Sequence, residues 1–192
     1  MGDFSHNRQK ILEYTRRALQ KRCDLVVFPE AALFGYHPVD LLERQSIVKA
    51  QLKELKLLER SLPKGISVIV GAITENTKKS GKNYYNSAVL LQKGKKPRVF
   101  AKELLPTYDV FDEGRHIEPG QVSKNSFKFK GKRILVTICE DIWGWPNAHQ
   151  GSSSPYPRNP IKSIKSKDID LVVNLSASPF TPNKLKGRQE VC

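Results

Sequence analysis

The sequence predicts an α/β domain in which helices and strands pack in layers. Amphipathic stretches with helical spacing alternate along the chain with apolar, β-branched runs, and the links between them are short. The run over residues 133–138 is nearly continuous in apolar residues, which is typical of a strand buried on both faces. With 192 residues, of which 39% are hydrophobic, the chain is long enough for one domain with its own core.

The first half of the chain contains two predicted helices and two predicted strands. A helix capped by Ser5 or Asn7 is expected to run to about residue 22. The next expected elements are a buried strand over residues 23–28, a loop over 31–40, an interrupted helix over 41–62 and a strand over 66–73. Pro29 ends the first of these strands, and Glu30 follows it at once.

The second half is predicted to be rich in strands. Strands over residues 84–92 and 98–101 follow turn signals and indicate an antiparallel meander. The irregular segment over 103–120 is long, and such loops usually carry function in compact domains. The remaining expected elements are a hairpin of residues 127–129 and 133–138, a loop over 151–160, a short helix near 161–166, a buried strand over 169–175 and a helix from residue 184.

Charge and composition exclude several classes of protein. The net charge is +14, but the 33 basic residues are scattered and mostly flank turns, which favours a solvated surface over a nucleic-acid-binding patch. No apolar run of membrane-spanning length and no secretory leader is visible. The three cysteines form no CxxC pair, so reduced thiols in a cytoplasmic protein are expected, and no residue spacing matches a metal site.

Three reactive side chains stand at the ends of three apolar strands. Glu30, Lys102 and Cys139 each end or directly follow such a strand. A carboxylate can accept the thiol proton, a thiolate attacks, and an ammonium can stabilise both the thiolate and an oxyanion. Together they would make a workable acyl-transfer site. Taken singly, each has a plain alternative: a solvated acid, a surface lysine and a buried core cysteine.

The sequence around these residues resembles a known family. The matching segments are Phe28-Pro29-Glu30 with Gly35-Tyr36, residues 102–115, residues 139–143, and residues 174–180 followed by Lys184. They resemble the carbon–nitrogen hydrolase (nitrilase) superfamily and, within it, the glutamine amidotransferase domain of glutamine-dependent NAD synthetases. The resemblance covers essentially the whole chain.

The resemblance implies a nitrilase-like αββα sandwich and a role for each matching residue. Glu30 would be the general base, Lys102 the oxyanion-stabilising cation, Cys139 the nucleophile and Glu113 a second carboxylate. Substrate would be held by Tyr108, Ser178 and Lys184. Without the family, these last three would be interpreted as a packed loop tyrosine, a turn serine and a surface lysine.

The resemblance also implies a substrate and a partner. L-Glutamine would form a thioester on Cys139, and the released ammonia would pass to an ATP-dependent synthetase domain that aminates deamido-NAD. The glutaminase domain would need no metal or cofactor, with ATP and Mg confined to the synthetase domain. The superfamily commonly forms homo-oligomers, so an oligomer is expected here, without contact to a membrane or nucleic acid.

Relative to the family pattern, residues 1–192 are expected to be a partial glutaminase domain, with the synthetase domain absent. Family members have a strand before the segment that matches residues 1–4 and further strands after residue 192. An uncovered sheet edge is a stability hazard. We therefore expect weak or no glutaminase activity from this chain alone.

Three other interpretations compete with a glutaminase. The chain could be a stand-alone amidase or nitrilase of the same superfamily, a basic nucleic-acid-binding domain, or an inactive fragment that acts only as an interaction partner. A nucleic-acid binder would show salt-sensitive affinity, because phosphate contacts release counterions.

Overall fold

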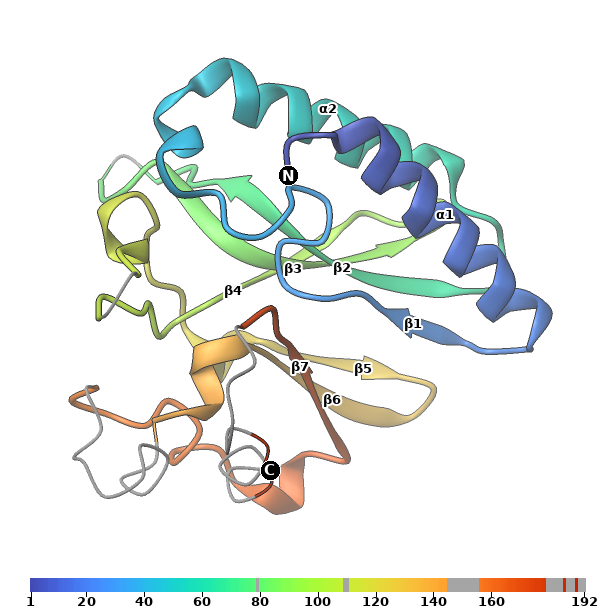
Figure 1. Cartoon of the computed structure of the whole chain (residues 1–192). Coiled ribbons are helices and arrows are strands. Elements are labelled where there is room, and N and C mark those ends of the chain that lie inside the picture. The colour runs from blue at the N-terminus through green and yellow to red at the C-terminus, as the bar shows by residue number, and fades with distance from the viewer. Residues whose placement is uncertain (79, 109–110, 145–155, 179–184, 186–188, 190–192) are drawn as a thin grey trace.

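A computed structural model describes residues 1–78, 80–108, 111–144, 156–178, 185 and 189. Two sheets face each other, and two helices cover the outer face of the first sheet (Figure 1). The helices are α1 (Phe4–Gln20) and α2 (Gln45–Ser61). The first sheet contains β1 (Leu25–Val27), β2 (Ser67–Glu75), β3 (Tyr84–Gln92) and β4 (Arg98–Ala101), and the second contains β5 (Ser126–Phe129), β6 (Lys132–Ile138) and β7 (Leu171–Leu175).

Strand pairing in both sheets follows the predicted pattern. The first sheet has the order β1-β2-β3-β4, with β1 parallel to β2 and the rest an antiparallel meander. In the second sheet β5 and β6 form the predicted hairpin, and β7 joins β6 in parallel with Ile138 opposite Leu175. The predicted boundaries of β3 and β4 are confirmed.

Alternating side chains of β2 build two separate cores. Val68, Val70 and Ala72 pack against the helices, whereas Ile69 packs against the second sheet. Successive residues of a strand point to opposite faces, so a strand between two layers must be apolar throughout. The helix–sheet–sheet part of the expected sandwich is confirmed, and the described residues supply no helical layer over the outer face of the second sheet.

The helix boundaries differ slightly from those expected. Asp3, not Ser5 or Asn7, caps α1, because its carboxylate accepts the backbone N–H of His6 at 3.1 Å. The predicted interruption of the second helix is confirmed: the 3₁₀ helix η1 (Val39–Glu43) is followed by an extended residue, Arg44, before α2 begins.

Two predictions for the last third of the chain are wrong. Residues 161–165 form a turn and irregular backbone and not an α-helix, and the 3₁₀ helix η6 (Ser166–Asp168) begins only at the end of the predicted range, since so short a segment gains too few hydrogen bonds to nucleate an α-helix. The strand at residues 169–175 is not buried along its length: Leu171 and Val172 are half exposed, because β7 is an edge strand.

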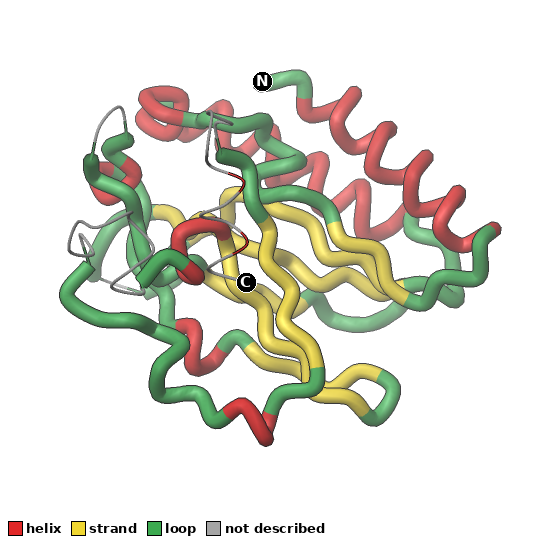
Figure 2. The backbone as a smooth tube through the Cα atoms, turned by 60° about the horizontal axis from the view of Figure 1, so that its bottom comes forward, coloured by secondary structure: helices red, strands yellow, loops and turns green. Residues whose placement is uncertain are grey.

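The described helices are all too short or too polar to cross a bilayer. The longer irregular segments gather at one end of the strands, and the tight β5–β6 turn lies at the other (Figure 2). The three strand ends that carry reactive side chains lead into the first of these regions.

Candidate active site

The structure brings the three predicted strand-end residues together. Glu30 follows β1, Lys102 follows β4 and Cys139 follows β6. The Lys102 Nζ lies 2.9 Å from Glu30 Oε1. Burial and the nearby negative charge of Glu30 both raise the pKa of the Cys139 thiol. All three side chains are at least 95% buried. A carboxylate, an ammonium and a thiol therefore share one space shielded from water.

Glu113 joins this cluster as a second carboxylate. It opens the 3₁₀ helix η2 (Glu113–Arg115), and its Oε2 accepts from Lys102 Nζ at 2.6 Å. The Lys102 ammonium thus lies between two carboxylates. Burial by itself would lower the pKa of Lys102, but the charges of Glu113 and Glu30 outweigh it and raise that pKa well above its ordinary value. Lys102 is a permanent cation in this site.

The thiol of Cys139 is protonated in the resting site. Burial raises its pKa, the negative charge of Glu30 raises it further, and Lys102 acts in the opposite direction without prevailing. As predicted, the Lys102 ammonium favours the thiolate, but burial and the charge of Glu30 together have the larger effect. Attack by sulfur requires transfer of the proton, and Glu30 is the adjacent carboxylate that can accept it.

Backbone geometry presents the nucleophile at a sharp turn. Cys139 has a φ of +43°, a left-handed conformation that costs energy for a residue with a Cβ, and it starts the 3₁₀ helix η4 (Cys139–Ile142). Strained backbone of this kind concentrates at functional sites.

Two glycines allow the catalytic segments to lie close to neighbouring backbone. A Cβ at Gly71 would lie 2.3 Å from the carbonyl oxygen of Pro29, directly before Glu30. A Cβ at Gly120 would lie 2.4 Å from the carbonyl oxygen of Ala101, directly before Lys102, and the Gly120 N–H donates to the Lys102 carbonyl. Any larger residue at either position would displace a catalytic segment.

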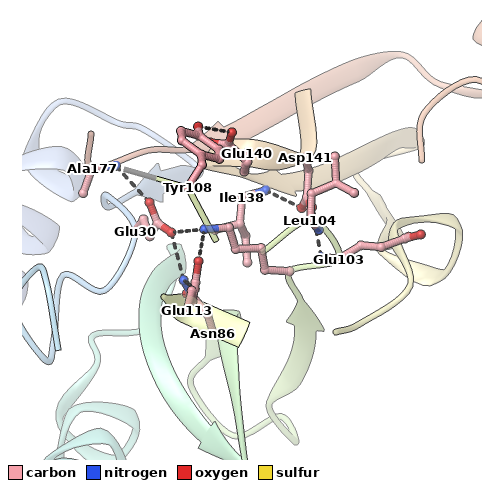
Figure 3. Close-up of polar contacts among 11 residues, drawn as sticks. Glu30, Asn86, Glu103, Leu104, Tyr108, Glu113, Ile138, Glu140, Asp141 and Ala177 are labelled. Atoms are coloured by element: carbon pink, nitrogen blue, oxygen red, sulfur yellow. Dashed lines mark hydrogen bonds and ion pairs between the residues drawn. The ribbon is translucent and has the colours of Figure 1, made fainter. Parts of the chain in front are cut away.

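Asp141 ties the lysine segment to the nucleophile turn. Its Oδ1 accepts the backbone N–H groups of Glu103 and Leu104, and its Oδ2 accepts that of Ile138, each at 2.9 Å (Figure 3). The side chain is fully buried. Burial raises its pKa to about 7, although the three N–H donors favour the charged form.

A second polar group lies beside the nucleophile. The Glu140 carboxylate is buried and accepts the Tyr108 hydroxyl at 2.5 Å. Burial and the charge of Glu140 raise the pKa of Tyr156. Ser178 follows Ala177, whose N–H donates to Glu30 Oε2 at 3.2 Å. The structure thus places Tyr108 and Ser178 next to the catalytic residues, whereas Lys184 lies outside the described residues.

Three residues of the site received no role from the sequence: Asn86, Glu140 and Asp141. Glu140 and Asp141 stand in the segment that follows the nucleophile, so their position was a usable signal. Asn86 lies within β3, next to the equally polar Ser87, so its residue type did not single it out. Its contacts with Glu30 and Glu113 span 56 and 27 residues of sequence, which no local pattern reveals.

Comparisons with known proteins agree with this geometry. Residues 1–149 match the family model of carbon-nitrogen hydrolases. The chain is 39% identical over 187 residues to the glutamine-dependent NAD(+) synthetase of Synechocystis sp., which covers 96% of this chain and 33% of that protein. The corresponding synthetase of Thermotoga maritima is 36% identical, over 96% of this chain and 29% of that protein. The chain therefore spans about a third of the length of these curated relatives.

Solved structures show the same fold. The glutamine-dependent NAD+ synthetase from Acinetobacter baumannii superposes with a TM-score of 0.82 at 31% identity, over 98% of this chain and 32% of that one. An amidase from Nesterenkonia sp. superposes with a TM-score of 0.68 at 18% identity, over 96% of this chain and 64% of that one, which supports the fold alone.

Proposed function

The chain belongs to the carbon-nitrogen hydrolase family, and we propose that it hydrolyses the side-chain amide of L-glutamine through a thioester on Cys139. One observation carries this proposal. The Cys139 thiol lies against Glu30, whose carboxylate shares the Lys102 ammonium with Glu113. A protonated thiol beside a buried carboxylate and a fixed cation suits attack on a neutral amide.

The proposed reaction has two halves. As Glu30 takes the thiol proton, the Cys139 sulfur bonds to the amide carbon, and Lys102 stabilises the negative oxygen that develops. The carbon–nitrogen bond then breaks, Glu30 returns the proton to the leaving ammonia, and a thioester remains. Glu30 next removes a proton from water, whose oxygen attacks the thioester carbon. The carbon–sulfur bond breaks, glutamate leaves, and Glu30 returns the proton to sulfur to restore the thiol.

Glutamine is favoured as the substrate by the names of the relatives and by the second polar group. The relatives that match most of this chain are glutamine-dependent NAD(+) synthetases. Tyr108, Glu140 and Ser178 lie next to the nucleophile, where they can bind the charged groups of an amino acid. We propose that Lys184 contributes to the same subsite.

The proposal also covers a synthetase domain as the partner, the cofactors, the cellular location and the oligomeric state. The 192 residues would form part of a glutaminase domain whose ammonia is used by a synthetase domain, and that domain would lie within the two thirds of the relatives that this chain does not match. The steps above use only side chains of this chain, so we propose no metal or cofactor for amide hydrolysis, with ATP and Mg needed by the synthetase domain. A cytoplasmic homo-oligomer without affinity for nucleic acid stays a prediction.

Covalent labelling tests the proposal most directly. The purified chain is incubated with an electrophilic glutamine analogue, and peptides are analysed by mass spectrometry. We expect an adduct on Cys139 that excess glutamine blocks and that Glu30→Ala abolishes. Equal labelling of all three cysteines would contradict the proposal and favour an inactive fragment.

Ammonia release separates a glutaminase from a stand-alone amidase. We expect release from glutamine to exceed release from a simple aliphatic amide of the same chain length, and the reverse order would favour the amidase. The rate is expected to be well below that of a full-length relative, because Val27, Leu171 and Val172 leave apolar side chains exposed on the edge strands β1 and β7.

A further inference from the structure

We propose that Asn86 is a positioning residue of this site, whose side-chain amide holds the base Glu30 and the second carboxylate Glu113 side by side and charged. The proposal rests on the proposed function, because it assigns Asn86 a part in thiol activation. Asn86 Nδ2 donates to Glu30 Oε1 at 2.8 Å and to Glu113 Oε1 at 2.6 Å (Figure 3). One amide thus uses both of its hydrogens on the two carboxylates.

The Oδ1 atom of Asn86 indicates why the amide points its nitrogen at the two carboxylates. Asn86 is 95% buried, and its Oδ1 has no hydrogen-bond partner among the described residues. A buried polar oxygen without a partner costs about 1–3 kcal/mol. The reverse orientation would bring this oxygen against two carboxylate oxygens. The donor side therefore faces the acids, and the two carboxylates dictate the orientation of the amide.

The charge balance of the cluster explains why donors are needed there. Glu30 and Glu113 carry two negative charges, and Lys102 supplies one positive charge to both. Two carboxylates that share one buried site tend to retain a proton. A protonated Glu30 cannot accept the thiol proton of Cys139. The two N–H groups of Asn86 stabilise the charged form of both acids without adding a second cation.

The backbone of Asn86 positions the same cluster. Asn86 lies on the central strand β3, where it pairs with Ile73 of β2, and its carbonyl accepts the Lys102 backbone N–H at 2.9 Å. Asn86 therefore contacts Glu30, Lys102 and Glu113 from one rigid strand. A side chain on a central strand is held more firmly than one on a loop.

Other titratable groups also face this cluster and must stay unchanged in a test. Besides Glu30, Lys102 and Glu113 they are Tyr36 from the loop after β1, Tyr108 from the segment before η2, Cys139, Glu140 and Asp141 from η4, and Tyr156. The variants proposed below alter none of them.

The test is the pH dependence of Cys139 alkylation by iodoacetamide, followed by peptide mass spectrometry. This reaction needs no glutamine. Asn86→Asp replaces the donor with a third acid, so the pH at which alkylation reaches half its maximal rate should rise by about one unit or more. Asn86→Ala removes the donor without adding charge, so Glu30, the base that must accept the thiol proton, should retain its own proton to a higher pH, and the half-maximal pH should rise by less than in Asn86→Asp. Gln51→Glu is the matched control, since Gln51 is fully buried on α2 and bonds to the Ile73 N–H and not to the cluster.

The outcomes separate this proposal from the proposed function. An unchanged half-maximal pH in folded Asn86→Ala overturns the positioning role, as does an equal shift in Gln51→Glu. If Asn86→Asp does not fold, Asn86→Ala alone decides. A shifted alkylation profile in a chain that does not hydrolyse glutamine supports the positioning role and contradicts the proposed function. Where glutamine is hydrolysed, kcat should fall about tenfold in Asn86→Asp with KM little changed, as expected for impaired proton transfer.

Discussion

Two ionic clusters flank the helix η2 and have nearly the same chemistry in opposite surroundings. Glu113, its first residue, joins Glu30 and Lys102, whose side chains are only 1% and 2% exposed. Arg115, its last residue, lies 2.9 Å from Glu43 and 3.7 Å from Asp40, and these side chains are 50% and 72% exposed. Each cluster therefore has two carboxylates that share one cation.

The third group of each cluster differs as well. Asn86 gives the buried cluster two further hydrogen bonds. In the exposed cluster His116 Nε2 lies 4.0 Å from Asp40 and 3.9 Å from Glu43, and these three groups form an arrangement that could bind a cation. Arg115 supplies one positive charge to these two acids. Burial strengthens the electrostatic interactions of the first cluster, whereas water screens those of the second.

The largest expected effect comes from the base. Glu30→Gln keeps the size of the side chain and removes its ability to accept a proton, so glutamine hydrolysis should fall about 10²–10⁴-fold. Glu43→Gln makes the same change in the exposed cluster and should leave the rate within about twofold. Steady-state ammonia release from both variants makes the comparison. Equal losses would show that the two clusters do not differ as argued.

The cations should differ in their contribution to stability. Lys102→Met leaves two buried carboxylates without their partner and should lower the free energy of unfolding by about 3–5 kcal/mol. Arg115→Met removes a partner of exposed acids and should cost no more than about 1 kcal/mol. Urea denaturation monitored by circular dichroism measures both. A cost of 2 kcal/mol or more for Arg115→Met would be inconsistent with a screened surface cluster.

Asp141 is a third case: its carboxylate is buried like that of Glu30, but it accepts hydrogen bonds from backbone N–H groups and not from a cation. Its pKa is raised from 3.8 to about 7 in the folded chain, so between these values the folded state binds a proton that the unfolded state lacks. This contribution to stability is fully present below about pH 4 and is lost as the pH rises to 7, by up to about 4 kcal/mol.

The variant Asp141→Asn does not titrate and serves as the reference. The difference between wild-type and variant free energies of unfolding, measured in urea from pH 4 to 8, should change with pH in that direction. A constant difference would show that the three N–H donors keep Asp141 charged throughout this range.

Salt should produce the smallest effect and only at the exposed cluster. At 0.5 M salt the Debye length is about 4–5 Å, so the small stability difference between wild type and Arg115→Met should nearly vanish. The larger difference for Lys102→Met should persist, since buried pairs are screened much less. Repeating the urea titrations at low and high salt checks this. Loss of the Lys102→Met effect at high salt would indicate that water reaches the buried cluster.

The sequence predicted the strands of this fold better than their burial. β3 and β4 have the predicted boundaries, and a turn signal precedes each of them. The sequence did not predict that Leu171 and Val172 are exposed, since an apolar run has the same pattern in a central strand and in an edge strand. Asp3 replaced the expected caps because Ser, Asn and Asp are nearly equivalent N-cap residues, and only the chain path selects among them.

Local patterns of the sequence predicted most helices and strands, the family, and the strand-end positions of Glu30, Lys102 and Cys139, because periodicity and local motifs are short-range properties of the chain. Folding brings together groups that no local pattern connects: Asn86 bridges Glu30 and Glu113, Asp141 joins two distant segments, and Glu113 and Arg115 of one short helix lie in buried and exposed surroundings. The contact between Glu30 and Ala177 spans 147 residues. Which polar groups share a buried space depends on how whole layers pack, and burial then sets the strength of their interactions.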